Sequence, residues 1–202
     1  MRVLVVGGTG TIGLAVVQAL SPHHRVVTAS YAKADWKVDL ASPDSIEALF
    51  RSVGRLDAVV SAAGRAAFGP LLALKDEDFD LCLQNKLMGQ VNLVRLGIPH
   101  VNDNGSFTLT SGVLAREPMP GSAAISLVNS GLEAFALAAS LELPRGLRIN
   151  VISPPWVSET LKAMGRDPSH GMPAADVAKA YVESVEGKDN GRVIDARSFA
   201  PR

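Results

Sequence analysis

Short apolar runs alternate with longer periodic segments along the whole chain, and this alternation constrains the fold more than any other feature. The runs predict strands at residues 2–6, 25–29, 37–40, 56–61, 106–111, 148–153 and 192–195. The segments between them predict helices at 12–20, from 42 onward, and at 76–96, 122–143 and 174–185. Such alternation gives a parallel sheet with crossover helices on both faces. With no composition shift along residues 1–202, we expect a single doubly wound α/β domain of about seven strands.

The charge balance excludes several classes of partner. Among the 202 residues, Lys plus Arg and Asp plus Glu are each 20, so the formal net charge is zero. Nucleic-acid binding depends on a basic excess, and no apolar stretch approaches the ~20 residues of a membrane span. The start MRVLVVGG is too short for the apolar core of a signal peptide. We therefore expect a cytoplasmic protein with neither nucleic-acid nor membrane partners.

Cysteine and histidine offer little chemistry here. Cys82 is the single cysteine, so we interpret it as a small buried hydrophobe in a reducing compartment rather than a catalytic thiol. The four histidines have no second ligand at metal spacing, so no metal site is predicted.

A glycine-rich turn joins the first predicted strand to the first predicted helix. Its sequence VVGGTGTIG contains Gly8-x-Gly10-x-x-Gly13, the dinucleotide fingerprint between a strand and a helix. The glycines permit a tight turn, a close approach of backbone to pyrophosphate, and close packing of helix on strand. A purely structural glycine turn is the alternative, but the context favours a Rossmann-like nucleotide site. The residues expected to hold cofactor here are Gly7, Thr9, Gly10, Thr11, Ile12 and Gly13.

The end of the second predicted strand decides between NAD and NADP. An acidic residue there would hold the ribose 2′-hydroxyl. The strand instead ends Thr28-Ala29-Ser30-Tyr31, with Lys33 nearby. Ser30 and Lys33 could accommodate a 2′-phosphate, so we expect NADP, with NAD less favoured.

Several segments resemble the short-chain dehydrogenase/reductase family, and the resemblance covers nearly the whole chain. Asp39-Leu40 is similar to the family's adenine contact, and Ser111 to its catalytic serine at the end of the fifth strand. The Ser61–Gly64 segment SAAG resembles the Asn-Asn-Ala-Gly motif, and RINVISP at 148–154 resembles the sixth strand. The resemblance implies an oxidoreductase acting on a small carbonyl or alcohol. The further cofactor contacts that it implies are Ala62, Ala63, Gly64, Pro154, Trp156 and Val157, although Trp156 could simply cap the core.

The chain departs from the family at its proton donor. The family's Tyr, and the Lys four residues after it, fall on Ile125 and Asn129 when the chain is anchored on GLEAF at 131–135. The two tyrosines, Tyr31 and Tyr181, are followed four residues later by Asp35 and Val185. The sequence therefore contains no Tyr-x-x-x-Lys motif.

Lysine and asparagine are exchanged between two helices. The family's catalytic Asn, three residues before a Gly, falls on Lys86, and the family's Lys falls on Asn129. The predicted catalytic set is therefore Ser111, Lys86 and Asn129. In this hypothesis Lys86, or water held by Lys86 and Asn129, replaces the missing tyrosine, since a desolvated lysine can have a lowered pKa. The alternative for Lys86 is an ordinary solvated surface charge.

Three further expectations concern size and assembly. The connection at 31–38 is too short for the family's usual helix, and the short segment 157–173 suits a mobile flap over a shallow substrate pocket. Apolar stripes on the helices at 76–96 and 122–143 indicate a homodimer or homotetramer. The leading functional hypothesis is an NADP-dependent oxidoreductase, and the alternative is a catalytically silent NADP(H)-binding sensor or partner-binding protein. The stripes comprise Leu81, Leu87, Val91, Val94, Leu127, Leu132, Phe135 and Leu141.

Overall fold

A seven-stranded parallel sheet forms the centre of the protein. The computed structural model describes residues 1–32 and 34–201. Within these ranges the strand order is β3-β2-β1-β4-β5-β6-β7, and every pairing is parallel. This order confirms the predicted Rossmann-like, doubly wound sheet, whose direction of winding reverses between β1 and β4. The strands are β1 Arg2–Val6, β2 Arg25–Ser30, β3 Trp36–Lys37, β4 Leu56–Ser61, β5 Val101–Thr110, β6 Arg148–Ser153 and β7 Arg192–Asp195.

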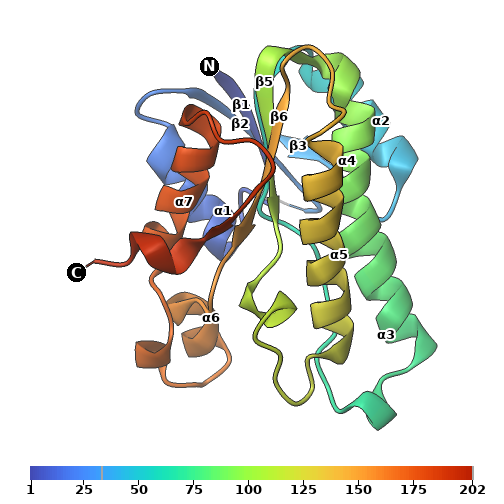
Figure 1. Cartoon of the computed structure of the whole chain (residues 1–202), viewed down its shortest axis with the longest axis vertical. Coiled ribbons are helices and arrows are strands. Elements are labelled where there is room, and N and C mark those ends of the chain that lie inside the picture. The colour runs from blue at the N-terminus through green and yellow to red at the C-terminus, as the bar shows by residue number, and fades with distance from the viewer. Residues whose placement is uncertain (33, 202) are drawn as a thin grey trace.

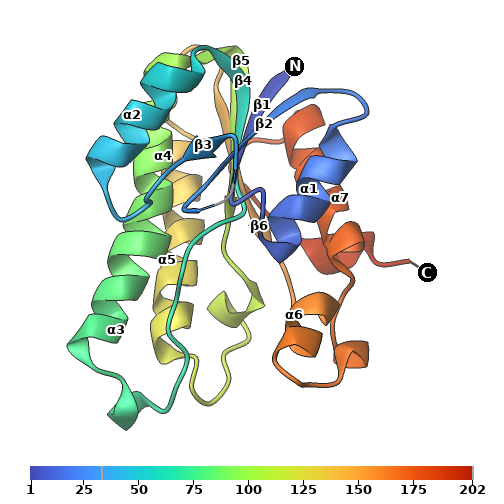
Figure 2. The same cartoon turned by 180° about the vertical axis from the view of Figure 1, so that it is seen from behind.

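Helices cover both faces of the sheet. In Figure 1, α1 and α7 lie side by side on one face, and α2, α4 and α5 lie on the other. Figure 2 shows the same three layers from behind. The helices are α1 Thr11–Leu20, α2 Pro43–Val53, α3 Asp76–Leu81, α4 Gly89–Gly97, α5 Ala123–Ala139, α6 Ser158–Ala163 and α7 Ala174–Glu186. None of those described is long and apolar enough to cross a membrane.

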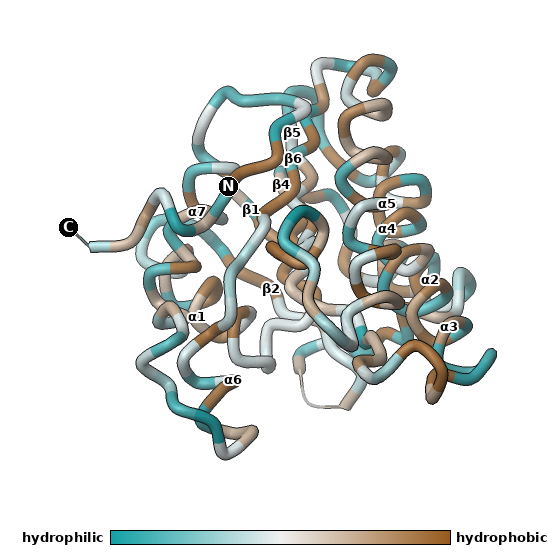
Figure 3. The backbone as a smooth tube through the Cα atoms, turned by 60° about the horizontal axis from the view of Figure 1, so that its bottom comes forward, coloured by the Kyte–Doolittle hydropathy of each residue, from teal (hydrophilic) through white to brown (hydrophobic). Residues whose placement is uncertain are grey.

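Two apolar cores result from the alternation of side chains along the strands. In β1, Val3 and Val5 face α1 and α7, whereas Leu4 and Val6 face α2, α4 and α5. All four are essentially inaccessible to solvent. Figure 3 shows β1 as a continuous hydrophobic run, in contrast to the banded helices. A strand segment buried on both faces must be apolar, which explains the run VLVV at residues 3–6.

Two strands differ from their predicted limits. β3 occupies Trp36–Lys37 rather than 37–40, because the side chain of Asp39 accepts from the Ala41 N–H and turns the chain toward α2. β5 begins at Val101 rather than 106. The polar stretch 102–105 resembles a turn in sequence, but it forms an irregularity at which the pairing register with β4 shifts.

Two predicted helices also differ. The helix expected at 76–96 is interrupted by a π-helical segment, Cys82–Met88, between α3 and α4. Such segments add a residue to a turn and are frequent at functional sites. The helix expected at 122–143 ends at Ala139, because residues 141–143 bond to carbonyls three or four residues back in turns rather than continuing α5.

The connection between β2 and β3 and the segment 157–173 are both short, as expected. Between β2 and β3 the described residues form bends and no helix, and the predicted phosphate contact Lys33 lies outside the described residues. The segment 157–173 contains α6 and a single turn at Pro168–His170. A bridge between Val157 and Met172 joins its two ends into one compact unit.

Candidate functional site

Three adjoining cavities lie along the carboxyl ends of the strands, where parallel α/β sheets bind their ligands. Their volumes are about 350, 320 and 150 Å³. The first and second share Ala63 and Gly64, and the second and third share Ser111 and Trp156. We call them the nucleoside, central and terminal cavities. Together they form one continuous site from Asp39 to Trp156.

The nucleoside cavity gathers residues from the ends of β1 and β2 and from the connection between β3 and α2. Six of the predicted cofactor residues line it, namely Gly7, Ser30, Asp39, Leu40, Ala63 and Gly64. The Asp39 carboxylate is oriented by the Ala41 N–H at 2.9 Å. Tyr31, Arg65 and Asn85 also line this cavity and were not predicted. Tyr31 and Arg65 lie in loops, which carry no periodic signal in the sequence, and Asn85 lies in the π-helical segment.

The glycine turn contains two buried packing positions and a group of exposed residues. Gly7 has φ +85°, and a Cβ there would lie 2.6 Å from the Ala62 carbonyl oxygen. A Cβ on Gly13 would collide with the Gly7 carbonyl. These two glycines are therefore required for packing. Thr9, Gly10 and Thr11 are exposed and lie outside the three cavities, and Gly10 caps α1 without a side-chain bond.

An acidic residue reaches the glycine turn from the β2–β3 connection. The Asp35 Oδ2 accepts from the Thr28 N–H at 3.0 Å and from the Thr28 hydroxyl at 2.9 Å. These hydrogen bonds lower the pKa of Asp35. The Thr28 side chain in turn packs beneath Gly8. Asp35 was not predicted here because it follows β2 by five residues. It reaches Thr28 only because the connection between β2 and β3 folds back along β2.

Lys86 lies in the wall of the central cavity and is not a solvated surface charge. It is only 7% exposed, and its Nζ donates to the carbonyls of Thr110 and Ser111 at 3.2 and 3.5 Å. Burial lowers its pKa to about 8. The Lys86 side chain also packs against Gly64, where a Cβ would lie 2.9 Å from Lys86 Cγ. The predicted residues that line this cavity with Lys86 are Ile12, Ala62, Ala63, Gly64, Ser111, Pro154, Trp156 and Val157.

A second polar side chain fixes the end of β5. The Gln90 amide donates to the Thr110 carbonyl at 2.9 Å and accepts from the Thr110 N–H at 2.8 Å. Tyr181 lies behind the same residue, with its hydroxyl 2.6 Å from Thr110 Oγ1. Burial raises the pKa of Tyr181. This tyrosine is a packing residue of α7 and does not substitute for the family's proton donor.

Ser111 is held by a buried carboxylate. Its hydroxyl donates to Glu133 Oε1 at 2.8 Å, and Glu133 Oε2 lies 3.6 Å from Arg116 Nε. Glu133 comes from α5, one turn after Asn129. The sequence contained Glu133 within the segment used to anchor the resemblance, but it carried no sign of a role. The contact depends on where β5 ends relative to α5.

Asn129 and Ile125 line the terminal cavity from α5. Asn129 is 1% exposed, yet its Oδ1 has no hydrogen-bond partner among the described residues. An unsatisfied buried acceptor costs free energy, which a ligand hydroxyl or N–H would recover. Ile125, at the family's tyrosine position, offers the cavity only hydrocarbon.

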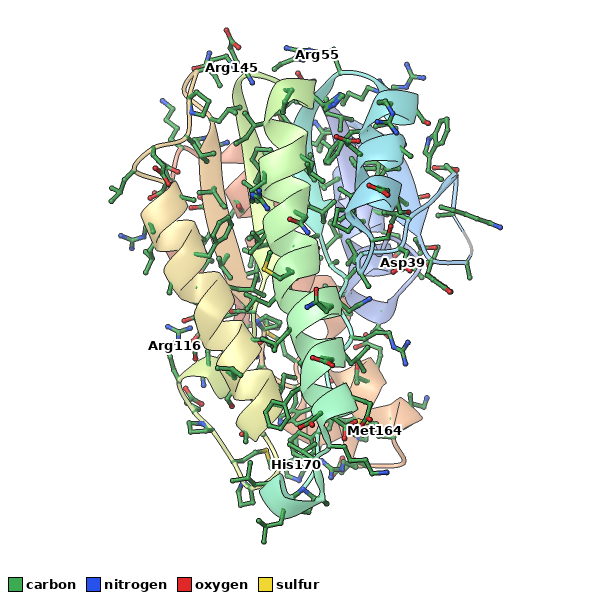
Figure 4. The ribbon with its side chains drawn as sticks, turned by 90° about the vertical axis from the view of Figure 1, so that its right-hand side faces the viewer. Asp39, Arg55, Arg116, Arg145, Met164 and His170 are labelled. Atoms are coloured by element: carbon green, nitrogen blue, oxygen red, sulfur yellow. The ribbon has the colours of Figure 1, made fainter. Side chains whose placement is uncertain are left out.

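Trp156 forms one edge of the site, after β6. Its ring meets Phe68 edge-on at 6.3 Å, and the Arg166 guanidinium lies 5.9 Å from its centre. Figure 4 shows Met164 and His170 of the following segment at this end of the molecule, far from Arg55 and Arg145. Among the described residues, no group of three or more His, Cys, Asp or Glu side chains could hold a metal ion.

The comparison with known families agrees with this arrangement. A family model described as enoyl-(acyl carrier protein) reductase matches residues 12–194. The chain belongs to the short-chain dehydrogenase/reductase family. The predicted resemblance is thereby confirmed at the level of the family.

Solved structures match the chain over nearly its whole length. The protein lin1944 from Listeria innocua is 40% identical, with a TM-score of 0.93 and coverage of 96% of this chain and 98% of that one. A small-chain dehydrogenase crystallised in complex with NADPH is 26% identical, with a TM-score of 0.85 and coverage of 96% and 95%.

Curated relatives are more distant. An uncharacterized oxidoreductase of Methylorubrum extorquens is 25% identical over 76% of this chain and 72% of its own. The 3-oxoacyl-(acyl-carrier-protein) reductase FabG of Thermotoga maritima is 26% identical over 55% of this chain. The chain spans about half the length of this FabG and of the hydroxynaphthalene reductase of Aspergillus fumigatus. These three curated relatives are oxidoreductases by name.

Proposed function

We propose that this protein is an NADP(H)-dependent oxidoreductase acting on a small carbonyl or alcohol, with an atypical set of site residues. The observation that carries the proposal is the continuous site from Asp39 to Trp156, in which Ser111 stands where the central and terminal cavities meet. A similar dehydrogenase crystallised with NADPH supports NADP as the cofactor.

The residues present fit a dinucleotide. Gly7 allows the tight turn because it has a positive φ and no side chain. The N-terminus of α1 offers its free N–H groups to a pyrophosphate. Asp39 and Leu40 would contact the adenine, with Ser30 near the ribose. Asn129, with its unpaired buried acceptor, would take a ribose hydroxyl. When bound, the nicotinamide ring supplies or accepts a hydride.

Two side chains would serve the substrate oxygen. Ser111 lies at the junction of the cavities and is positioned to hydrogen-bond it. The Lys86 ammonium supplies positive charge from beside the Ser111 backbone, where exclusion of water strengthens its effect on developing negative charge. With a pKa of about 8, Lys86 is largely protonated at neutral pH. A role for Lys86 as the proton donor stays a prediction.

The terminal cavity limits the substrate. Its volume of about 150 Å³ suits a small molecule, and its walls are mainly apolar. A small, weakly polar carbonyl compound therefore fits better than a charged one. The apolar wall residues are Val113, Leu114, Ile125, Pro155 and Trp156.

One observation favours a second function. Ile125 replaces the family's proton donor, and loss of a positioned acid typically costs ~10²–10⁴-fold in rate. The alternative is therefore a catalytically silent NADP(H)-binding protein that acts as a sensor or binds a partner.

Binding and turnover separate these functions. We expect NADPH to bind in a fluorescence titration, more tightly than NADH, and to be consumed with a panel of small ketones and aldehydes. Ser111→Ala should lower kcat/KM by about 100-fold, because it removes the hydroxyl that hydrogen-bonds the substrate oxygen. Ser52→Ala, an exposed serine on α2, is the control. Tight binding without turnover indicates the silent protein, and absence of binding contradicts both functions.

A further inference from the structure

The proton of Ser111 has a preferred direction in this structure. Its hydroxyl carries a single proton, which it donates to Glu133 Oε1 at 2.8 Å. The second acceptor within reach, the Ile152 carbonyl, is more distant at 3.4 Å. A serine committed in this way presents lone pairs, and no proton, to the cavity on its other side. Ser111 is therefore arranged to accept a proton from an alcohol while passing its own to Glu133.

Glu133 lies between Ser111 and the molecular surface. The residue is 9% exposed and does not line any of the three cavities. Its Oε2 points toward Arg116, whose side chain is 48% exposed, at the molecular surface beside α5 (Figure 4). One carboxylate oxygen thus faces the site through Ser111, and the other faces the surface.

Other charged groups around Glu133 have different tasks. The protons of Lys86 are directed to the carbonyls of Thr110 and Ser111 rather than to Glu133. Arg116 also neighbours the carboxylates of Glu117 and Asp195, which are bridged by Arg197. Cys82, from the same π-helical segment as Lys86, is buried and bonded to the Ala67 N–H. Among these groups, only Glu133 is hydrogen-bonded to the Ser111 hydroxyl.

We infer that Glu133, acting through Ser111, is the proton acceptor and donor that replaces the missing tyrosine. Glu133 is a positioning residue, because it reaches the substrate only through Ser111. The inference rests on the proposed oxidoreductase function and names the route that its proton takes.

The proton steps balance in both directions. In alcohol oxidation, the substrate O–H bond breaks and its proton moves to Ser111 Oγ, while the original Ser111 proton moves to Glu133 Oε1. The electron pair of the substrate C–H bond leaves as the hydride accepted by the oxidised cofactor, and the carbonyl forms. In reduction, protonated Glu133 returns its proton to Ser111 Oγ, and Ser111 protonates the developing alkoxide. Glu133 is reset by exchange with water at its surface edge.

Glu133→Gln separates a proton relay from simple positioning. The glutamine oxygen can still accept the Ser111 hydrogen bond, but the amide cannot take up the proton. We expect kcat to fall by at least about 100-fold, with NADPH affinity unchanged in a fluorescence titration. The pH profile for alcohol oxidation should change in this variant, because the amide cannot take part in proton transfer. Glu142→Gln, an exposed glutamate just beyond α5, is the matched control and should behave as wild type.

A spectroscopic measurement tests the pair without turnover. In cofactor-free protein, the infrared carboxylate band that vanishes in Glu133→Gln should shift in Ser111→Ala, because that variant removes the hydrogen bond. An unshifted band overturns the pairing. Full turnover of Glu133→Gln with an unchanged pH profile overturns the relay while leaving the oxidoreductase function intact. A wild-type protein that binds no NADP(H) or NAD(H) overturns the proposed function itself, and the relay with it.

Discussion

Lys86 is interpreted differently from the sequence and from the structure. On a helix it resembles a solvated charge, yet its Nζ lies under the end of β5 and donates to two backbone carbonyls. The desolvation of an ammonium group is expensive, and it lowers the pKa of Lys86 to about 8. Retaining a buried lysine at a free-energy cost is understandable where its charge serves the site.

The free-energy cost of burying the Lys86 ammonium leads to a measurable prediction for Lys86→Met. Unfolded lysine titrates at 10.5 and folded Lys86 at about 8, so the unfolded state binds more protons between these values. The unfolding free energy of wild type should therefore rise relative to Lys86→Met as pH increases from 8 to 10.5, by roughly 3 kcal/mol. Urea unfolding at pH 7.5 and pH 10 measures this difference. The exposed Lys75→Met is the control, and parallel pH dependences for Lys86→Met and wild type would contradict the prediction.

Asp35 bears on the choice between the two cofactors. Its carboxylate accepts hydrogen bonds from Thr28, beside the glycine turn, where its charge would oppose the 2′-phosphate of a bound NADP. Asp35→Asn should tighten NADPH binding relative to NADH by up to about fivefold, because unit charges close to water interact by on the order of 1 kcal/mol. Titrations with both cofactors test this. Asp44→Asn, on the far side of the β3–α2 turn, should leave the ratio of the two affinities unchanged.

At the scale of elements, the π-helical segment Cys82–Met88 determines which residues reach the site. It lies between α3 and α4 and turns Lys86 toward the end of β5. Gln90, one turn later, then reaches the Thr110 backbone. The periodicity of the sequence predicted a helix here, but an extra residue in one turn leaves no mark in the hydrophobic pattern.

The junction of β1 and α1 allows two glycines to be compared. Gly13→Ala should lower the thermal midpoint by several degrees, because its Cβ would collide with the Gly7 carbonyl. Gly10→Ala should fold normally, since its added Cβ would lie 3.4 Å from the Gly7 carbonyl oxygen, an ordinary contact distance. The same methyl group should weaken NADPH binding, because it hinders the approach of the pyrophosphate to the backbone. Thermal unfolding and fluorescence titration distinguish these effects. Equal thermal midpoints for the two variants would show that the collision is relieved without cost.

At the scale of the whole molecule, α4 and α5 form one side of the protein (Figure 1). The predicted apolar stripes on these helices divide into two groups. Val91, Val94 and Leu132 are buried in the protomer's own core and are not available for assembly. On α5, Leu127 and Leu137 remain 52% and 48% exposed, whereas Leu141, at 88%, lies in the turn that follows the helix. The stripe overestimates the free surface but leaves an apolar edge on α5.

We expect assembly into a homodimer or homotetramer through this side. Leu137→Glu should shift the protein toward monomer, because it places a charge on an apolar contact. Light scattering after size-exclusion chromatography gives the mass. Leu14→Glu, equally exposed on α1 at the other face, is the matched control. A wild-type protein that is monomeric at all concentrations contradicts the prediction.

The sequence by itself determined the parallel α/β sheet, the glycine turn, the family and the absence of a Tyr-x-x-x-Lys motif. Each depends on local pattern, such as the apolar run of β1 or the strand–turn–helix context of Gly13, or on a count of tyrosines. Only the tertiary structure decided that Lys86 is buried, that Asp35 returns to Thr28 and that Glu133 holds Ser111. These contacts join residues 24, 7 and 22 positions apart. They depend on where neighbouring elements end relative to one another, which hydrophobic periodicity does not encode.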